Sequence, residues 1–229
     1  MTIRITGISS MATRQVLADL ADTYLQRSGV VVAFESVGGM DAAKRVQAGE
    51  PFDVVVLAAD AIDKLVAAGR VVAGSRTDLV RSAVAIAVRE GSVRPDIGSE
   101  DALRRAVLSA RAVGYSTGPS GVALMKLFER WGIADTVRNR IVQAPPGAPV
   151  GQLVASGEVE LGFQQLSELM HLPGIDLLGP MPPGSETVTI FSSGLCATSA
   201  QPGAVRALLA FMRSPAAVDA KRRHGMEPA

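Results

Sequence analysis

The chain has few of the residues on which several classes of protein depend. Its single cysteine, Cys196, excludes an internal disulfide and any cysteine-based metal cluster. Its two histidines, His171 and His224, lie far apart and lack the spacing of metal ligands. The 23 basic residues nearly balance the 22 acidic ones, so the excess of positive charge typical of nucleic-acid-binding proteins is absent. We therefore expect no bound metal, no cofactor and no nucleic-acid partner.

The sequence also lacks a segment that would cross or enter a membrane. It contains no run of about 18 apolar residues, the length that a spanning helix needs. Its first residues, MTIRITGISSMATR, have neither the basic start nor the apolar stretch of about 7–15 residues that a secretory leader has. These absences predict no membrane span. They also predict a location in the cytoplasm, or in the periplasm if a leader has been removed.

What the chain does contain is a large share of aliphatic residues. Apolar residues make up 48% of it but aromatic residues only 4%, so the core must consist mainly of alanine, valine, leucine and isoleucine. A length of 229 residues suits one domain or two small domains packed together.

The first third of the chain alternates strands and helices. Apolar stripes at helical spacing and short β-branched runs predict strands over 3–6, 30–35 and 53–57, and helices over 11–26, 41–48 and 61–68. Such a βαβαβα order is typical of a parallel sheet covered by helices on both faces.

A second series follows a long alternating strand at 78–90. It comprises strands over 111–115, 141–143 and 159–163, and helices over 119–131 and 150–156. A second long strand at 186–197 then leads to helices over 202–213 and 215–223. We therefore predict two α/β lobes joined by two crossing strands. The first lobe takes residues 1–82 and 192–229, the second takes 83–191, and a ligand cleft lies between them.

Five loops follow the predicted parallel strands: GISSMATR, ESVGGMD, YSTGPSG, QAPPGAPVG and GFQQLSE. In open α/β sheets, ligands bind beyond the carboxyl ends of the strands. Most of these loops combine glycine with hydroxyls or amides ahead of a helix, and the same residues are also ordinary helix caps. Neutral donors and helix N-termini together favour a small anion. In the second lobe the candidates are Ser116, Thr117 and Ser120.

Two cations lie one turn inside helices that follow these loops. Arg14 stands four residues after Ser10, on the same side of the helix, and Lys44 lies in the second helix. Either side chain has the reach to bind a carboxylate. The alternative is that both are solvated charges on helix faces.

The sequence contains no familiar catalytic motif. It has no G-x-S-x-G turn, no H-E-x-x-H helix and no phosphate-binding loop with its lysine. Glu35, Asp60 and Glu168 lie near strand ends, where a carboxyl group acts as acid or base, or else caps a helix or pairs with arginine. His171 fits a surface or packing role, and Cys196 fits a buried thiol. The catalytic residues, if any exist, are not identified by the sequence.

Three stretches resemble substrate-binding proteins of molybdate-type ABC transporters. They are GISSMATRQVLADLADTYLQRSGVVVAFES, KRVQAGEPFDVVVLAADAIDKLVAAGRV and RALLAFMRSPAAVDAKRRHGMEP. The resemblance covers almost the whole chain. It implies the type II periplasmic-binding-protein fold, in which two α/β lobes close on a ligand by a hinge.

The resemblance also assigns ligand-binding positions. The first family serine matches Ser9 or Ser10, and the second matches Gly38 or Gly39. Backbone contacts fall at Ser120 and Gly147, and a family tyrosine falls at Gln165. Two side-chain donors are thus changed, and a tetrahedral oxyanion needs a closed shell of donors. These changes argue against molybdate. The hydroxyl- and amide-rich loops, with Arg14 nearby, suit an organic carboxylate at least as well as a metal oxyanion.

Three functions follow from this comparison. The first is a solute-binding protein that takes an oxyanion, a dicarboxylate or a tricarboxylate, with an ABC transporter permease as its partner. The alternative is a carboxylate isomerase on the same fold, similar to aconitate isomerase, which shifts a proton between carbons. An effector-binding domain is the least favoured, because no DNA-binding segment is present in the sequence.

Overall fold

The structure is a computed structural model that describes residues 3–145 and 147–229. The chain divides into two compact units. Unit 1 comprises Met1–Ser82 and Ile190–Ala229, and unit 2 comprises Ala83–Thr189. Two long strands, β4 (Thr77–Arg89) and β9 (Val188–Leu195), each contain a point of division between the units.

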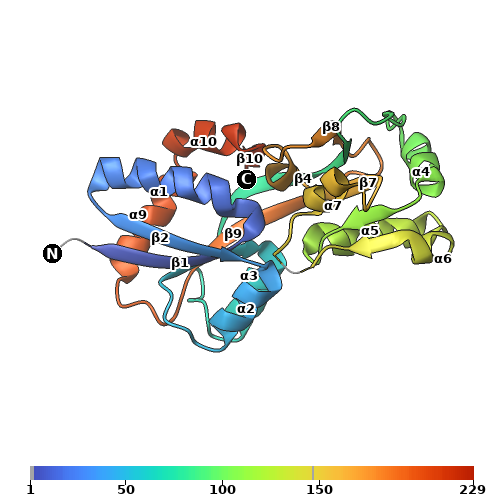
Figure 1. Cartoon of the computed structure of the whole chain (residues 1–229). Helices are drawn as coiled ribbons and strands as arrows, with labels where there is room; N and C mark the ends of the chain where they lie inside the picture. The colour runs from blue at the N-terminus through green and yellow to red at the C-terminus, as the bar shows by residue number, and fades with distance from the viewer. Residues whose placement is uncertain (1–2, 146) are drawn as a thin grey trace. The chain divides into compact units, whose positions relative to one another are not determined.

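Unit 1 contains a mixed sheet in the order β2-β1-β3-β9-β4, with β10 against β4. Besides β4 and β9, its strands are β1 (Arg4–Ser10), β2 (Val31–Val37), β3 (Val54–Ala58) and β10 (Met226–Pro228). β1 is parallel to β2 and β3, whereas β9 is antiparallel to β3 (Figure 1). The carboxyl ends of β1, β2 and β3 therefore lie at one edge of the sheet.

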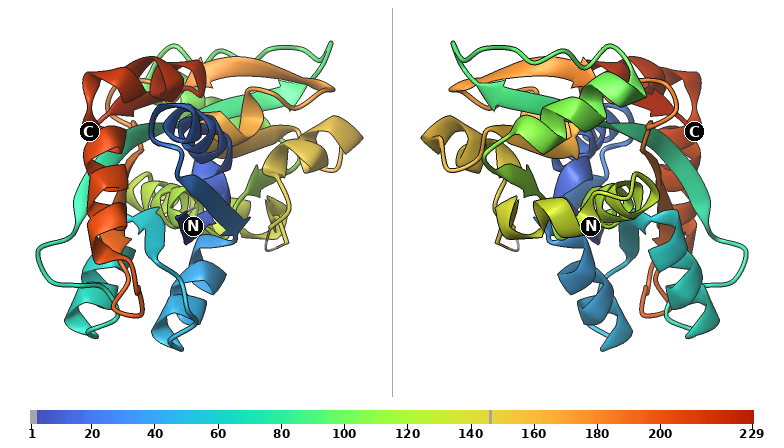
Figure 2. Two further views of the ribbon diagram at one scale, coloured as in Figure 1. Left: turned by 90° about the vertical axis from the view of Figure 1, so that its left-hand side faces the viewer. Right: turned by 90° about the vertical axis from the view of Figure 1, so that its right-hand side faces the viewer.

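Helices cover both faces of this sheet, because the central strands point apolar side chains alternately to one face and to the other. One apolar cluster joins Ile5 of β1 and Val54 of β3 to α1, α9 and α10. The other joins Ile8 of β1 and Val55 of β3 to α2 and α3 (Figures 1 and 2). The helices are η1 (Met11–Thr13), α1 (Arg14–Ser28), α2 (Gly39–Gln47), α3 (Ala59–Ala67), α9 (Pro202–Arg213), η3 (Pro215–Ala217) and α10 (Val218–Arg223).

Unit 2 has its own sheet, in the order β4-β7-β5-β6, with β8 on the other side of β4. Its further strands are β5 (Val113–Tyr115), β6 (Ile141–Gln143), β7 (Leu161–Gln165) and β8 (Ile175–Pro180). β5 is parallel to β6 and β7, so their carboxyl ends also share an edge. β4 is antiparallel to both of its neighbours in this unit.

The helices of unit 2 also cover both faces of their sheet. An apolar cluster packs α4 (Glu100–Ser109), α5 (Pro119–Arg130) and α6 (Ala134–Val137) on one face. On the other face, α7 (Val150–Ser156) lies against β7, where a Cβ atom on Gly162 would stand 2.4 Å from Val154 Cγ2. Glycine is therefore needed for this close approach. The short helix η2 (Arg138–Arg140) precedes β6, and α8 (Leu166–Leu169) follows β7.

The predicted α/β class is confirmed, and the differences lie in individual elements. β1 extends to Ser10 and β2 to Val37, so residues expected in loops lie on strands. The helix α4 was not predicted, although Ser99 is an N-cap whose Oγ accepts a hydrogen bond from the Ala102 backbone N–H at 3.1 Å. The strands β8 and β10 and the short helices α6, α8 and η2 were also missed.

The packing prediction for Cys196 is confirmed. Cys196 is a buried free thiol, and burial raises the pKa of this thiol to about 12. Phe128 is fully buried, and its ring stacks on Trp131 with centroids 6.0 Å apart. Within residues 3–145 and 147–229, no helix combines the length and the hydropathy needed to cross a bilayer.

Candidate functional site

In unit 1, the candidate residues gather at the carboxyl ends of β1 and β2. Ser9 is paired in register with Ser36 on β2, and their Oγ atoms lie 2.8 Å apart. Ser36 was not predicted as a site residue, because only the strand register brings it beside Ser9. The Ser9 hydroxyl also donates to the Ser10 backbone oxygen at 3.3 Å, so its single donor hydrogen is used within the protein.

Ser10 differs from Ser9 in having an unused hydroxyl. Successive strand residues face opposite sides of the sheet, so Ser10 faces the side covered by α2. Its side chain is buried, and its Oγ has no hydrogen-bond partner among the described residues. A Cβ atom added at Gly39 would lie 3.5 Å from Ser10 Cβ. The unused hydroxyl therefore lies beside the first turn of α2.

The first turn of α2 leaves its backbone donors uncapped. Gly38 is the N-cap and makes no side-chain hydrogen bond to the helix. The first backbone N–H groups of a helix have no acceptor within it, and they carry the positive end of the helix dipole. Ser10, Gly38 and Gly39 thus bring an unused hydroxyl and free amide donors together.

Arg14 and Lys44, the two cations predicted near this end of the sheet, are both exposed to solvent. Arg14, the first residue of α1, is exposed, and its side chain forms no hydrogen bond or ion pair with the residues that the structure describes. Lys44 is exposed on α2 and lies 3.9 Å from Asp41 Oδ1. The structure thus shows Lys44 as a solvated charge and leaves Arg14 available for a ligand.

In unit 2, three candidates meet where β5 leads into α5. Ser116 Oγ lies 2.9 Å from Ser120 Oγ and accepts a hydrogen bond from the Gly118 backbone N–H at 3.3 Å. Ser120 is buried. Gly118 is the N-cap of this 12-residue helix and provides no side-chain cap. Pro119 has no backbone N–H and the Gly121 N–H donates to the Gly118 backbone oxygen at 3.0 Å, so the Ser120 N–H is the donor that the first turn leaves for a ligand. Thr117 lies in the same turn.

Gly121 allows this turn to pack tightly. A Cβ atom at Gly121 would lie 1.8 Å from the Ser116 backbone oxygen, which no side chain permits. Because Gly121 has no Cβ, the loop folds directly over the first turn of α5. This contact fixes the positions of the Ser116 hydroxyl and the helix N-terminus.

The end of β7 adds two amide side chains to this edge. Tyr115 pairs with Phe163, so the residues that follow them, Ser116 and Gln164, lie at the same edge of the sheet. Gln164 Oε1 accepts a hydrogen bond from the Val150 backbone N–H at 2.7 Å, at the start of α7. Gln164 Nε2 donates to Glu168 Oε1 at 2.8 Å. Gln164 thus connects β7, α7 and α8.

Gln165 is buried and only half satisfied. Its Nε2 donates to Thr189 Oγ1 at 2.8 Å, and its Oε1 has no partner among the described residues. The Thr189 hydroxyl is able to accept or donate, so the opposite amide orientation, with Nε2 free, satisfies Thr189 equally well. Gln165 therefore has one unused polar atom at the edge where Ser116 lies.

Gly147 is exposed in the loop that leads to α7, with φ +79°. A Cβ atom built on Gly147 would meet no described atom within 4 Å. A groove of about 350 Å³ runs along α5 from the Ser116 turn. Its lining includes Tyr115, Ser116, Thr117 and Gln143, and it also takes in Val122, Met125, Lys126 and Glu129 from the side of the helix.

The other candidate acids have ordinary roles, and only Glu168 is unusual. Glu35 pairs with Arg45 at 2.5 Å, and Asp60 lies 3.7 Å from Lys64, both on the surface. Glu168 pairs with no arginine, and burial raises the pKa of its carboxyl group to about 7. Residues 3–145 and 147–229 contain no group of three histidine, cysteine or acidic side chains able to hold a metal ion.

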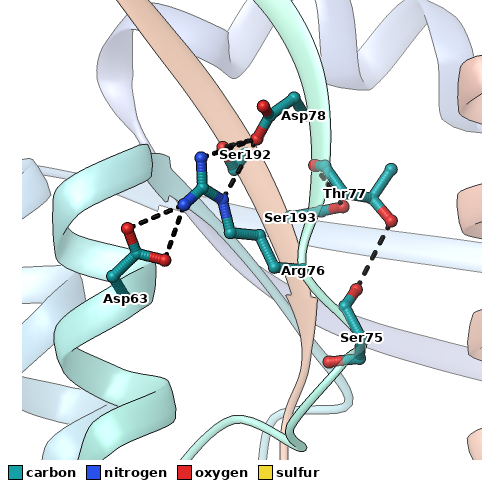
Figure 3. Close-up of polar contacts among 7 residues, drawn as sticks. All are labelled: Asp63, Ser75, Arg76, Thr77, Asp78, Ser192 and Ser193. Atoms are coloured by element: carbon teal, nitrogen blue, oxygen red, sulfur yellow. Dashed lines mark hydrogen bonds and ion pairs between the residues drawn. The ribbon is translucent and has the colours of Figure 1, made fainter.

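A separate polar cluster in unit 1 joins β4 to β9 (Figure 3). Arg76 Nη1 donates to both Asp63 carboxylate oxygens, at 2.6 and 2.7 Å, and Arg76 Nη2 donates to Asp78 Oδ1 at 3.0 Å. The buried Ser192 hydroxyl donates to the same Asp78 oxygen at 2.6 Å. Because these charges pair with one another, the cluster stabilises the strands of unit 1.

The two α/β units, with uncapped helix N-termini and hydroxyls at their sheet edges, define a solute-binding protein of the type II periplasmic-binding-protein fold. The chain belongs to the bacterial extracellular solute-binding protein family, whose sequence profile matches residues 5–227. The resemblance to molybdate-type binding proteins is thereby confirmed.

Similar proteins include an enzyme as well as transport proteins. The chain is 38% identical to aconitate isomerase from Pseudomonas sp., over 98% of this chain and 87% of that protein. It is 27% identical to the molybdate-binding protein ModA of Azotobacter vinelandii, over 91% of this chain and 84% of that protein.

Solved structures share the fold at lower identity. The periplasmic molybdate-binding protein of Azotobacter vinelandii has a TM-score of 0.81 and 20% identity, over 97% of this chain and 98% of that one. The sulfate-binding protein SubI of Mycobacterium tuberculosis H37Rv has a TM-score of 0.78 and 18% identity, over 99% of this chain and 87% of that one.

Proposed function

We propose that this protein binds a small anion, and that the anion is an organic carboxylate. The observation that carries the proposal is the buried, unpartnered Ser10 hydroxyl beside the uncapped start of α2. A buried hydroxyl without a partner is rare in native proteins, because it has lost its water without a replacement. An anionic oxygen at this position would accept from the hydroxyl and from the helix N–H groups together.

In this proposal, the groups of both units serve one ligand. Unit 1 offers Ser10 and the amides of Gly38 and Gly39, and unit 2 offers the Ser116–Ser120 turn and Gln165. Each group presents neutral donors, and the type II fold that the resemblance implies has two lobes that close on one ligand. If both groups contact the same anion, Ser10→Ala and Ser116→Ala should have non-additive effects on affinity.

The preference for a carboxylate over molybdate rests on the donors. Gly38 and Gly39 stand where the resemblance expects a serine, and Gln165 stands where it expects a tyrosine, so two hydroxyl donors are missing. The groove along α5 begins at Ser116 and Thr117 and contains the exposed Lys126. A ligand with two or three carboxylates has the length to use both the helix N-terminus and this cation, and a tetrahedral oxyanion does not.

A carboxylate isomerase is the second candidate. It is favoured by the 38% identity to aconitate isomerase over nearly the whole chain. Such a reaction needs a group that carries a proton at neutral pH, and the Glu168 carboxyl group fits this requirement. The molybdate-binding and sulfate-binding structures of the same fold favour binding without turnover. The resemblance to ABC-transporter binding proteins implies a transporter permease as the partner.

A single panel tests these alternatives. The thermal midpoint is measured with molybdate, tungstate, sulfate, phosphate, fumarate, succinate, citrate and both aconitate isomers, because a ligand that binds only the folded state raises it. We expect the largest shift with a di- or tricarboxylate, and a reduced shift in Ser10→Ala. A largest shift with molybdate would contradict the carboxylate assignment. Proton NMR of the aconitate samples over hours then reports turnover, and interconversion of the isomers would establish the enzyme.

A further inference from the structure

Glu168 is a partly buried carboxyl group that follows the end of β7 by one helical turn. Among the described residues, no arginine, lysine or histidine contributes to the pKa of Glu168. Its polar contact is the 2.8 Å hydrogen bond from Gln164 Nε2 to Oε1. Glu168 thus has no cation to balance its negative charge, so its role depends on whether its carboxyl group is ionised or protonated.

The orientation of the Gln164 amide is fixed by its other partner. The Val150 backbone N–H is a donor only, so it must meet Oε1 of the amide, and Nε2 must then face Glu168. Glu168 accepts this hydrogen bond through Oε1, whether it is ionised or neutral. Any proton that Glu168 carries therefore resides on Oε2. Protonation removes the negative charge and leaves the bridge to α7 intact.

We propose that Glu168 is a positioning residue of the unit 2 anion group, one that takes up a proton when the anion binds and then holds Gln164 and the start of α7 as a neutral acid. This inference rests on the proposed function. A second negative charge placed at the carboxyl edge would repel an ionised Glu168, and a neutral Glu168 removes the repulsion. Because burial already raises the pKa of this group to about 7, the proton is available at neutral pH.

Among the residues that the structure describes, the only side chain that affects the pKa of Glu168 is Gln164, and the charged groups of neighbouring elements have other positions. β7 and α7, which pack against α8, have no titratable side chain. β4 and β8 share an apolar cluster with Leu169 of α8. β4 carries Asp78 and Arg81 in its unit 1 part and Arg89 in its unit 2 part, and β8 carries Asp176. Arg89 Nη1 lies near Gly157, and Asp176 accepts a hydrogen bond from the Gly91 backbone N–H at 3.2 Å. His171, three residues beyond Glu168, is exposed.

The test is the pH dependence of anion affinity in the full chain. Sulfate, molybdate and fumarate serve as probes, because their charges do not change between pH 6 and pH 8. If only the neutral form of Glu168 supports binding, the dissociation constant of the wild type should rise about tenfold from pH 6 to pH 8. Glu168→Gln mimics the neutral acid. It should bind at pH 8 as tightly as the wild type binds at pH 6, with less than about a twofold change over the range.

His171→Gln is the matched control, and it should keep the pH dependence of the wild type. A pH dependence that persists in Glu168→Gln, or that disappears in His171→Gln, would overturn the inference while leaving anion binding intact. Binding of none of the three probes at any pH, in wild type and variant alike, would instead reject the proposed function.

A second measurement on the wild type does not depend on how the variants fold. Calorimetric titration at pH 7 in two buffers of different ionisation enthalpy counts the protons taken up on binding. We expect an uptake of about half a proton for each anion bound at this pH. An uptake of zero would overturn the inference.

Discussion

The hydroxyl oxygens of Ser9 and Ser36 lie 2.8 Å apart on paired strands, and this pair separates two adjacent serines into two roles. Ser9 is satisfied by β2, whereas the Ser10 hydroxyl, on the opposite side of β1, is buried without a partner. A single strand thus carries one serine that holds the sheet edge together and one that is available to a ligand.

Ser10→Ala should therefore reduce ligand affinity and leave stability unchanged. A hydrogen bond to a charged group contributes about 1.5–3 kcal/mol, so affinity for the best anion of the panel should fall at least about tenfold. The free energy of unfolding should stay within about 0.5 kcal/mol of the wild type, because the removed hydroxyl has no partner to lose. Isothermal titration and urea denaturation measure the two quantities.

Ser9→Ala provides the matched control with the opposite pattern. It leaves the Ser36 hydroxyl without its partner, which should lower the free energy of unfolding by about 1 kcal/mol. A loss of affinity in Ser9→Ala that equals the loss in Ser10→Ala would contradict this division of roles.

The parts of the fold that could be predicted are those whose signals are local. The bounds of α7 and α9 match the predicted 150–156 and 202–213, because apolar periodicity and a flanking glycine or proline mark their ends. The buried, fully apolar β3 was also evident from a short run of valines. Ser99 shows that a local signal was overlooked, since it caps α4 and precedes two acidic residues.

The site could be predicted only as far as its loops. Ser36, Gln164 and Thr189 enter it through strand register and side-chain hydrogen bonds between distant segments, and neither is readable from one sequence. The choice between Ser9 and Ser10 likewise depended on which side of β1 faces α2. The unusual state of Glu168 arises from burial, which depends on the packing of the whole unit.

Gly121→Ala should destabilise unit 2. The new Cβ atom would lie 1.8 Å from the Ser116 backbone oxygen, so the loop or the helix must move. Overpacking of this kind lowers the free energy of unfolding by about 1–3 kcal/mol, measured by urea denaturation. Gly203→Ala is the matched control, because a Cβ atom at Gly203 in α9 meets nothing within 4 Å. That variant should stabilise the protein by about 0.5–1 kcal/mol, since alanine is the better helix former.

Asp78→Ala should weaken the contact between β4 and β9 in unit 1. The variant leaves the buried Ser192 hydroxyl without its acceptor, and we expect a loss of about 1 kcal/mol in unfolding free energy, given the exposure of Asp78. The Ser192 hydrogen bond, and to a lesser degree Arg76, lower the pKa of Asp78 below its usual 3.8. This stabilisation is therefore present above pH 3.8 and is lost as the pH falls through the lower folded-state pKa.

The control for Asp78 is Asp63→Ala, which removes only an exposed ion pair with Arg76. Its effect should stay below about 0.5 kcal/mol. Equal losses in the two variants would show that the Ser192 hydrogen bond does not carry the effect.

Lys126→Ala should separate carboxylates from oxyanions. The Lys126 side chain lines the groove along α5 and forms no ion pair within the described residues. Its removal should weaken binding of fumarate or citrate several-fold, since a partly exposed charge contributes about 1 kcal/mol, and should leave sulfate binding unchanged. Lys64→Ala, on the exposed face of α3, should change neither affinity. An equal effect of Lys126→Ala on sulfate would indicate a general charge effect.

The Glu168 carboxyl group should also make stability depend on pH in the absence of ligand. Its pKa is about 7 in the folded protein against a usual value of 4.5, so the folded state favours the neutral form. The associated stability is fully present below pH 4.5 and is lost as the pH rises through about 7. One pKa unit corresponds to about 1.4 kcal/mol. The unfolding free energy of Glu168→Gln minus that of the wild type should therefore be about 2–3 kcal/mol larger at pH 8 than at pH 5. Urea denaturation across this range measures the difference, with Glu158→Gln, an exposed acidic residue after α7, as the control that should show no such gain. A constant difference between Glu168→Gln and the wild type would show that Glu168 is already ionised in the folded protein at pH 5.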